Sequence, residues 1–183
     1  MNLGGSHADV IMDDCRKSQT LDSLPGKAGG LPILIKKSAT ADTRTCDWSK
    51  VTKEQLREST EQHRDDVMKG LAFFMELIRE AGERHDIDKL SDLDGFHRDF
   101  QTGFKQTEWW DNHRKNARHH LLSEDGIPED VNLVDVLDMI TDCVMAGMGR
   151  SGSVYPLEIA PETLMKSFQN TVELLKAEIV VEA

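Results

Sequence analysis

The chain has 183 residues, and its 22 lysines and arginines against 33 aspartates and glutamates give a formal net charge of −11. This length suits one domain, or one domain with a tail. The acidic balance disfavours duplex nucleic acid and anionic membrane surfaces as partners, since both attract basic proteins. No apolar run is long enough to span a membrane, and no signal peptide is recognisable at the start. Three cysteines without C-x-x-C spacing favour a reducing cytoplasm.

The first 50 residues differ in composition from the rest. They contain no glutamate, and their seven basic and six acidic residues nearly cancel, whereas residues 51–183 carry 15 basic and 27 acidic residues. We therefore predict an irregular N-terminal arm over 1–50 and a helical domain over 51–183. The only apolar run of the arm, at 31–36, is a candidate strand or docking segment.

The pattern after residue 51 is helical, and the predicted fold class is all-α. Thr52 and Gln55 fit a capping box, and the helix that they begin should end near Gly82. In the helix that Asn132 should cap, we expect the apolar side to be Val134, Leu137, Ile140 and Val144. The later helices are expected at 92–101, at 107–121, from 132 to about 147, and from 161 to about 178.

Six of the seven histidines lie between residues 63 and 120. The adjacent pair His85-Asp86 can offer an imidazole and a carboxylate to one metal ion. Lys89 follows one helical turn later, where it could face a bound anion. A histidine at a helix end beside a capping aspartate is the alternative interpretation.

A second group of histidines follows two tryptophans. On a helix, His113, Asn116 and His120 would share one face, with Arg114 and Arg118 as a neighbouring basic stripe. His119 and His120 would point about 100° apart, so we expect only one of them to be a ligand. A solvated polar face is the alternative interpretation.

Three aspartates share a stripe of the helix that starts at Asn132. Asp142 lies in an otherwise apolar run, and a carboxylate there needs a partner or a metal. Asp135 and Asp138 fit an exposed acidic face better.

The order of these motifs resembles the HD superfamily of metal-dependent phosphohydrolases. Asp88 replaces the glycine, and Leu121 the glutamate, of the branch with H-D-x-G-K and H-H-E patterns, which argues against a cyclic di-GMP phosphodiesterase. A closer likeness, over about residues 52–179, is to an uncharacterised family of small HD-like proteins common in phages. The segments that carry it are His63, His85-Asp86-Ile87-Asp88-Lys89, Asn116-Ala117-Arg118-His119-His120, and Asn132-Leu133-Val134-Asp135 continuing to Asp138-Met139 and Asp142.

The resemblance implies an HD-domain-like helical bundle with one or two divalent metal ions (Mn, Fe, Co, Ni, Zn or Mg). His63 can join the others only if the chain doubles back before residue 85. The expected metal ligands are His63, His85, Asp86, His119, His120 and Asp142. The expected catalytic residues are Lys89, His113 and Asp86. The expected substrate-binding residues are Lys89, Arg114, Arg118, Arg150, Ser151 and Ser153.

Our leading hypothesis is a metal-dependent phosphohydrolase that acts on a nucleotide or a similar small phosphate ester through metal-activated water. One alternative is an HD-type di-iron oxygenase, which would use four histidines and two aspartates. Another is a non-catalytic phage protein that binds a nucleotide or a host partner. A homo-oligomer is left open.

Overall fold

The computed structural model describes residues 32–40, 42–105, 108–121 and 126–182 of the chain. Most of these residues are helical, and the predicted all-α class is confirmed. The predictions for residues 1–31 lie outside the described residues. The elements are β1 (Ile33–Lys36), a 3-10 turn η2 (Trp48–Lys50), α2 (Lys53–Arg84), α3 (Ile87–Ser91), α4 (Leu93–Gln101), α5 (Trp109–Asn116), α6 (Leu133–Ser151), α7 (Pro161–Glu178) and β2 (Ile179–Glu182).

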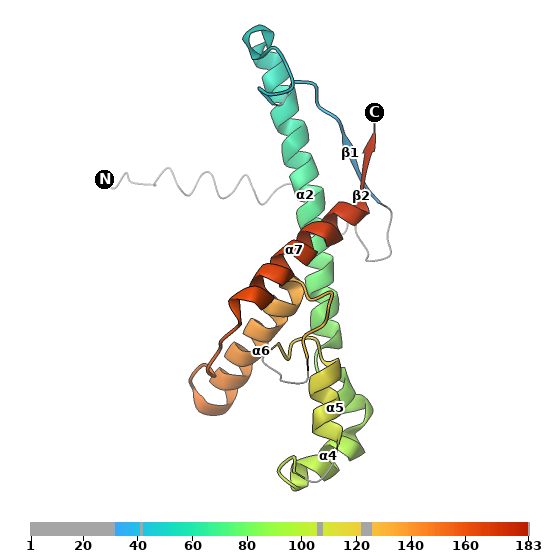
Figure 1. The fold of residues 1–183 in the computed structure, drawn as a ribbon, viewed down its shortest axis with the longest axis vertical. Helices are drawn as coiled ribbons and strands as arrows, with labels where there is room; N and C mark the ends of the chain where they lie inside the picture. Colours follow the sequence, from blue (N-terminus) through green and yellow to red (C-terminus); the bar gives the residue numbers. More distant parts are fainter. Residues whose placement is uncertain (1–31, 41, 106–107, 122–125, 183) are drawn as a thin grey trace, which may run out of the picture.

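The long helix α2 runs along the longest axis of the molecule, and α6 and α7 are inclined to it (Figure 1). Its predicted capping box is present, because Thr52 Oγ1 accepts from Gln55 N and Gln55 Oε1 accepts from Thr52 N. The helix runs past Gly82, where we expected its end, and stops at Arg84. One exposed glycine costs a helix only about 1 kcal/mol, too little to end it here.

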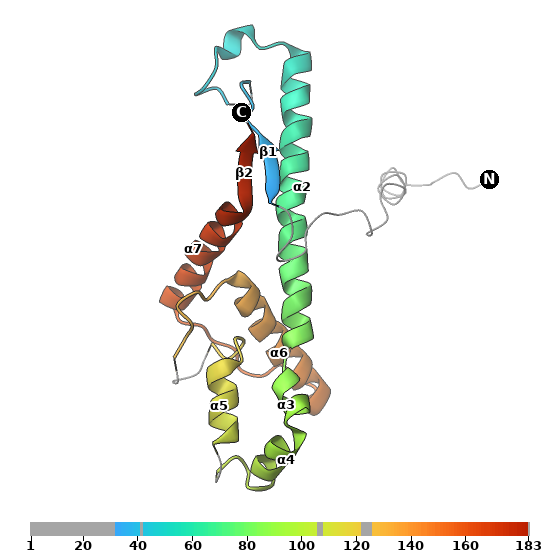
Figure 2. The same ribbon diagram turned by 90° about the vertical axis from the view of Figure 1, so that its right-hand side faces the viewer.

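The apolar run at 31–36, a candidate strand in the sequence, forms a strand over Ile33–Lys36 that pairs with a second strand over Ile179–Glu182. β1 and β2 run parallel, with Ile33 opposite Ile179. The pair also binds α2, since Gln62 Nε2 donates to Lys36 O at 2.6 Å and Lys69 Nζ donates to Leu34 O at 2.8 Å. Residues 33–36 of the predicted arm are thereby fixed against the helical domain (Figure 2).

The main apolar core lies between α6 and the segments that precede and follow it. Asn132 caps α6 as predicted, in a capping box with Asp135. The apolar side predicted for this helix is correct for Val134, which is buried, and wrong for Leu137 and Ile140, which are exposed. The residues that pack in the core are Val136, Met139 and Cys143, each one position before a predicted residue. The capping box and the contacts of the acidic side chains fix this rotation of the helix. The core residues are Leu121, Val131, Val136 and Met139, with Cys143 and Leu157 packed against them.

Helix α5 is shorter than the predicted helix 107–121. It ends at Asn116, and Ala117 is extended, so His119 and His120 lie in a turn rather than on a helix. Arg118 is drawn instead toward Asp135 at the start of α6, at 2.7 and 2.8 Å. No helix among the described residues is long and apolar enough to cross a lipid bilayer.

Candidate metal centre

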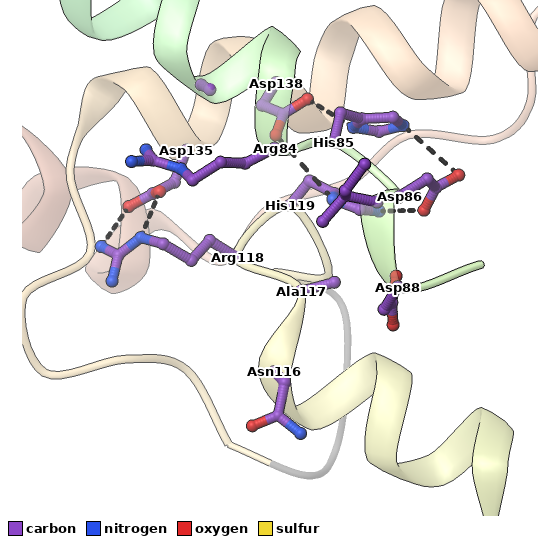
Figure 3. Close-up of a pocket in the computed structure, with 12 residues that line it drawn as sticks. Arg84, His85, Asp86, Asp88, Asn116, Ala117, Arg118, His119, Asp135 and Asp138 are labelled. Atoms are coloured by element: carbon purple, nitrogen blue, oxygen red, sulfur yellow. Dashed lines mark hydrogen bonds and ion pairs between the residues drawn. The ribbon is translucent and has the colours of Figure 1, made fainter. Parts of the chain in front are cut away.

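The candidate site lies where the end of α2, the start of α3, the segment after α5 and the first half of α6 meet. His85 closes α2, and Asp86 follows it with φ 55°. This left-handed conformation is uncommon for residues other than glycine and is found at functional sites. It turns the chain sharply between α2 and α3, so that the side chains of His85 and Asp86 both face the same cluster (Figure 3).

The Asp86 carboxylate is at the middle of the cluster. Its Oδ2 accepts a hydrogen bond from Lys89 Nζ at 2.6 Å, while its buried Oδ1 has no hydrogen-bond partner within the described part of the chain. Burial by itself raises the pKa of Asp86, but the hydrogen bond and the charge of Lys89 outweigh it and hold this pKa below its usual value. An ionised carboxylate with an unsatisfied buried oxygen is poised to bind a cation.

Asp138 orients one histidine through a hydrogen bond and lies near a second. Its Oδ1 lies 2.8 Å from Nδ1 of His85 and its Oδ2 lies 3.8 Å from Nδ1 of His119. Because an ionised carboxylate only accepts hydrogen bonds, Nδ1 of His85 carries the proton and its Nε2 keeps a free lone pair. Carboxylates hold metal-binding histidines in this way in many proteins.

Asp88 does the same for His113. Its Oδ2 lies 2.7 Å from Nδ1 of His113, and Nε2 of His113 points toward Nε2 of His120 at 3.0 Å. The ring of His113 is fully enclosed and stacks on Trp109 and Trp110, with centroids 5.4 and 5.1 Å away. The two tryptophans therefore cover the His113 side of the site.

The distances around Asp86 suit ligands of a common ion. Two atoms that each lie about 2.1 Å from one metal are about 3.0–3.4 Å apart at octahedral or tetrahedral angles. Oδ1 of Asp86 lies 3.4 Å from Nε2 of His113 and 3.6 Å from Nε2 of His119. The first separation lies at the upper end of this range and the second just above it, and both are too long for good hydrogen bonds.

A second set of atoms has the same character. Nε2 of His85 lies 3.6 Å from Oδ2 of Asp86 and 3.6 Å from Oδ1 of Asp142. Three groups of three residues each bring their potential ligand atoms within 4.8 Å of one another. The groups have residues in common, which would suit two neighbouring ions that share ligands. These groups are His113-His119-His120, His85-Asp86-His119 and Asp86-Asp88-His113.

Two of the histidines are held in the neutral form that metals bind. Burial, together with the nearby His120 and His85, lowers the pKa of His119 to about 3. Burial and the charges of His113 and Lys89 lower the pKa of His120 to about 4. At neutral pH both imidazoles therefore have a lone pair available.

A pocket of about 280 Å³ opens beside the cluster. Figure 3 shows Arg84, Asn116 and Arg118 around it, with the carboxylates of Asp135 and Asp138 on the α6 side. The side chain of Arg84 is exposed, and its Nη1 lies 3.9 Å from Oε2 of Glu80, a weak ion pair. The guanidinium group of Arg84 is therefore only weakly bound within the chain and could bind an anion in the pocket.

The structure does not bring His63 to this site. Because α2 is continuous, the 22-residue step from His63 to His85 separates them by roughly 33 Å. The doubling back that His63 needed does not occur, so His63 is an exposed histidine on the face of α2.

Most of the arginines and serines predicted to bind the substrate also lie away from the pocket. Arg150 lies eight residues beyond Asp142 on α6, roughly 12 Å along the helix axis. Ser151 Oγ donates to Gly147 O at 2.9 Å and contacts Ser153. These side chains belong to the end of α6, so they do not line the pocket.

Two predicted arginines are held in ion pairs. Arg114 pairs with Asp111 on α5 at 2.9 Å. Arg118 lines the pocket but binds both carboxylate oxygens of the buried Asp135 and also Asp130. These contacts raise its pKa further, with Asp135 the main cause. Arg118 is therefore fixed as a structural cation.

The predicted ranking of the three aspartates of α6 is wrong. Asp135 is buried and Asp138 is half-buried, although both fitted an exposed face, while Asp142 keeps about a third of its side chain exposed. The orienting roles of Asp138 and Asp88 and the place of Arg84 were not predicted. Asp138 could have been predicted as a site residue, because it lies one helical turn before Asp142 on the same face of α6. The sequence around Arg84 and Asp88 contains no pattern that marks either as a site residue.

Comparison with protein-family models, curated proteins and solved structures finds no match to this chain.

Proposed function

We propose that the protein is a metal-dependent phosphohydrolase of the HD type that acts on a nucleotide or a similar small phosphate ester. One observation carries this proposal: imidazole Nε2 atoms and carboxylate oxygens lie near one another at separations of 3.0 to 3.6 Å, close to those of ligands that share a metal ion. The residues concerned are His85, His113, His119, His120, Asp86 and Asp142. A divalent ion bound there would supply Lewis acidity and activated water.

The chain's own residues would prepare the site. Asp138 and Asp88 hold protons on Nδ1 of His85 and His113, which leaves Nε2 of each free to bind. Lys89 keeps Asp86 ionised and adds positive charge beside the reacting phosphate. His113 suits a ligand better than a general acid, because its ring is fully enclosed and a general acid must reach the substrate.

The size of the pocket and the exposed Arg84 beside it favour a small anionic substrate. Its volume of about 280 Å³ is at the small end of ligand pockets, which hold roughly 300–1,000 Å³. We assign Arg84 to the phosphate oxygens, because arginine binds them in a forked geometry and this side chain is exposed at the pocket. The proposed setting is the cytoplasm, where Cys46 and Cys143 would remain the free thiols that they are in the structure.

The test is phosphate release from a panel of nucleoside mono-, di- and triphosphates and an aryl phosphate, with Mn²⁺, Co²⁺, Ni²⁺, Zn²⁺, Fe²⁺ or Mg²⁺ added. We expect turnover with at least one metal, and a loss of at least about a thousandfold in Asp142→Asn. Asp94→Asn on α4 is the matched control, since this exposed carboxylate lies outside the cluster. Arg84→Ala should raise KM about tenfold and change kcat little.

A dinuclear iron oxygenase is the second candidate. The overlapping groups that share Asp86, His113 or His119, with Asp142 3.6 Å from Nε2 of His85, would also suit two iron ions. Iron in the purified protein, with O₂ consumption and no phosphate release on the panel, would favour the oxygenase over the hydrolase.

A further inference from the structure

The two oxygens of the Asp86 carboxylate have different surroundings. Oδ1 is buried and has no hydrogen-bond partner within the described part of the chain. Nε2 of His113 and Nε2 of His119 lie 3.4 and 3.6 Å from it, and Nε2 of His120 lies 3.0 Å from that of His113. These atoms are here called the inner position. It combines three histidines, two of them buried, with a free carboxylate oxygen.

A second set of atoms, here called the outer position, lies at Oδ2 of Asp86. Nε2 of His85 is 3.6 Å from this oxygen and 3.6 Å from Oδ1 of Asp142. The side chains of these three residues are between 24% and 32% exposed. His63, which fitted the set by its order in the sequence, is roughly 33 Å away along α2. The outer position therefore relies more on carboxylates, and is more open to water, than the inner position.

Lys89 already places a positive charge at the outer position. Its Nζ donates to Oδ2 of Asp86 at 2.6 Å. The ammonium group also lies 5.6 Å from the ring centroid of Trp110 and 6.0 Å from that of Phe96, and aromatic rings attract cations at such distances. The side chain of Lys89 is only 20% exposed, so packing as well as charge holds the ammonium group beside Oδ2.

A metal ion at the outer position would have to compete with this ammonium group. It would need a lone pair of the same oxygen and would lie beside a like charge, in a partly buried site where screening by water is weak. Displacing a hydrogen bond between charged groups costs a factor of roughly 10 to 100 in affinity. An ion at the inner position does not meet this cost, because Lys89 binds Oδ2 and not Oδ1.

We propose that Lys89 controls how many ions the centre binds. Its ammonium group takes the place of a second ion, so the inner position fills first and the outer position fills only at a much higher metal concentration. Lys89 follows Asp86 on the first turn of α3, so the turn that carries the shared carboxylate also carries its competing cation. The inference rests on the metal centre of the proposed function, but not on the hydrolysis of a phosphate ester.

The first experiment counts the Mn²⁺ bound to the full chain by equilibrium dialysis over a range of free Mn²⁺ concentrations. Wild type should bind in two steps, and the second should need at least about a hundredfold more free Mn²⁺ than the first. Lys89→Met should narrow this gap at least about tenfold, whereas Lys89→Arg, which keeps the charge, should keep the gap. Lys176→Met is the matched control, since it removes an exposed lysine of α7 that pairs with Glu173.

Two results would overturn the proposal. One is a wild type that binds two ions at the same free concentration, and the other is a gap that Lys89→Met leaves unchanged. A general effect of charge would tighten both steps equally and would therefore leave the gap unchanged. Circular dichroism checks the folding of each variant, and Lys89→Gln is the second neutral replacement if Lys89→Met does not fold.

The second experiment assigns the two steps to residues. His120→Ala should weaken the first step at least about tenfold, and Asp142→Asn should weaken only the second. Loss of the first step in Asp142→Asn would place the first ion outside the inner position and contradict the proposal. Two-step binding without phosphate release from any substrate would refute the hydrolase alone. A wild type that binds no Mn²⁺ would refute the metal centre and, with it, both proposals.

Discussion

Nδ1 of His113 lies 2.7 Å from Oδ2 of Asp88, and this contact links α5 to α3 at the edge of the candidate metal centre. It fixes which nitrogen of His113 carries the proton and turns the other toward Asp86 at 3.4 Å. Asp88 follows Asp86 by two residues, so the same short turn supplies both the central carboxylate and the one that orients His113.

Replacing Asp88 should therefore weaken metal binding without unfolding the protein. We expect Asp88→Ala to lower metal affinity about 10- to 100-fold, the usual effect of losing a residue that orients a ligand. Asp88→Asn should lose less, because its amide oxygen still accepts from Nδ1. Competition with a chelator measures both, with Asp94→Ala as the control; equal affinity in Asp88→Ala and wild type would refute the orienting role.

Acid should destabilise the metal-free protein below about pH 6.5. Burial lowers the pKa of His119 to about 3 and of His120 to about 4, whereas both would titrate near 6.5 in the unfolded chain. Between these values the unfolded state binds more protons, so the free energy of unfolding falls as the pH falls. Burial raises the pKa of Asp138, which acts in the opposite direction.

Thermal unfolding in excess chelator between pH 7.5 and 4.5 measures this effect. His119→Gln should flatten the dependence on pH, and His63→Ala, which removes an exposed histidine of α2, should leave it unchanged. A wild-type melting temperature that does not fall over this range would contradict the burial of neutral imidazoles.

Arg118 should matter for stability rather than for substrate binding. Arg118→Ala leaves the carboxylate of Asp135 buried without its charged partner, which should cost about 2–3 kcal/mol. Lys176→Ala, which breaks an exposed pair with Glu173, should cost less than about 0.5 kcal/mol. Denaturant unfolding gives both values. Unchanged stability together with a raised KM would restore the substrate role predicted for Arg118.

Two helical glycines should respond to alanine in opposite ways. A Cβ at Gly147 would lie 2.5 Å from Ser153 O and 2.6 Å from Tyr155 N, so the backbone would have to move and stability should fall by about 2 kcal/mol. A Cβ at Gly82 meets nothing within 4 Å, so Gly82→Ala should raise stability by about 0.5–1 kcal/mol. Equal effects in chemical denaturation would show that the segment after α6 does not pack closely on it.

The sequence predicted the helices better than their faces. Local signals decided the starts of α2, α6 and α7, since Thr52, Asn132 and Pro161 act on their own helix ends. The rotation of α6 depends on its partners instead. Arg118 binds Asp135 and turns it inward. The two residues are 17 positions apart in the chain, so the hydrophobic periodicity of α6 does not indicate this contact.

The candidate site could be predicted in part for the same reason. His85 and Asp86 are adjacent, so one turn of the backbone brings both to the cluster. His119 and His120 both reach it only because α5 ends at Asn116, which the helical spacing did not indicate. His63 fitted the motif order, but the distance along a continuous helix excludes it from the site of its own chain.

The central claim is tested most directly by metal analysis of the purified protein, before and after dialysis against Mn²⁺, beside two variants. Wild type and His63→Ala should carry about one or two divalent ions per chain, and the double variant His85→Ala/Asp86→Ala should carry none while remaining helical. If wild type holds no metal even after dialysis, or if the double variant holds as much as wild type, the histidines and aspartates around Asp86 are not a metal centre.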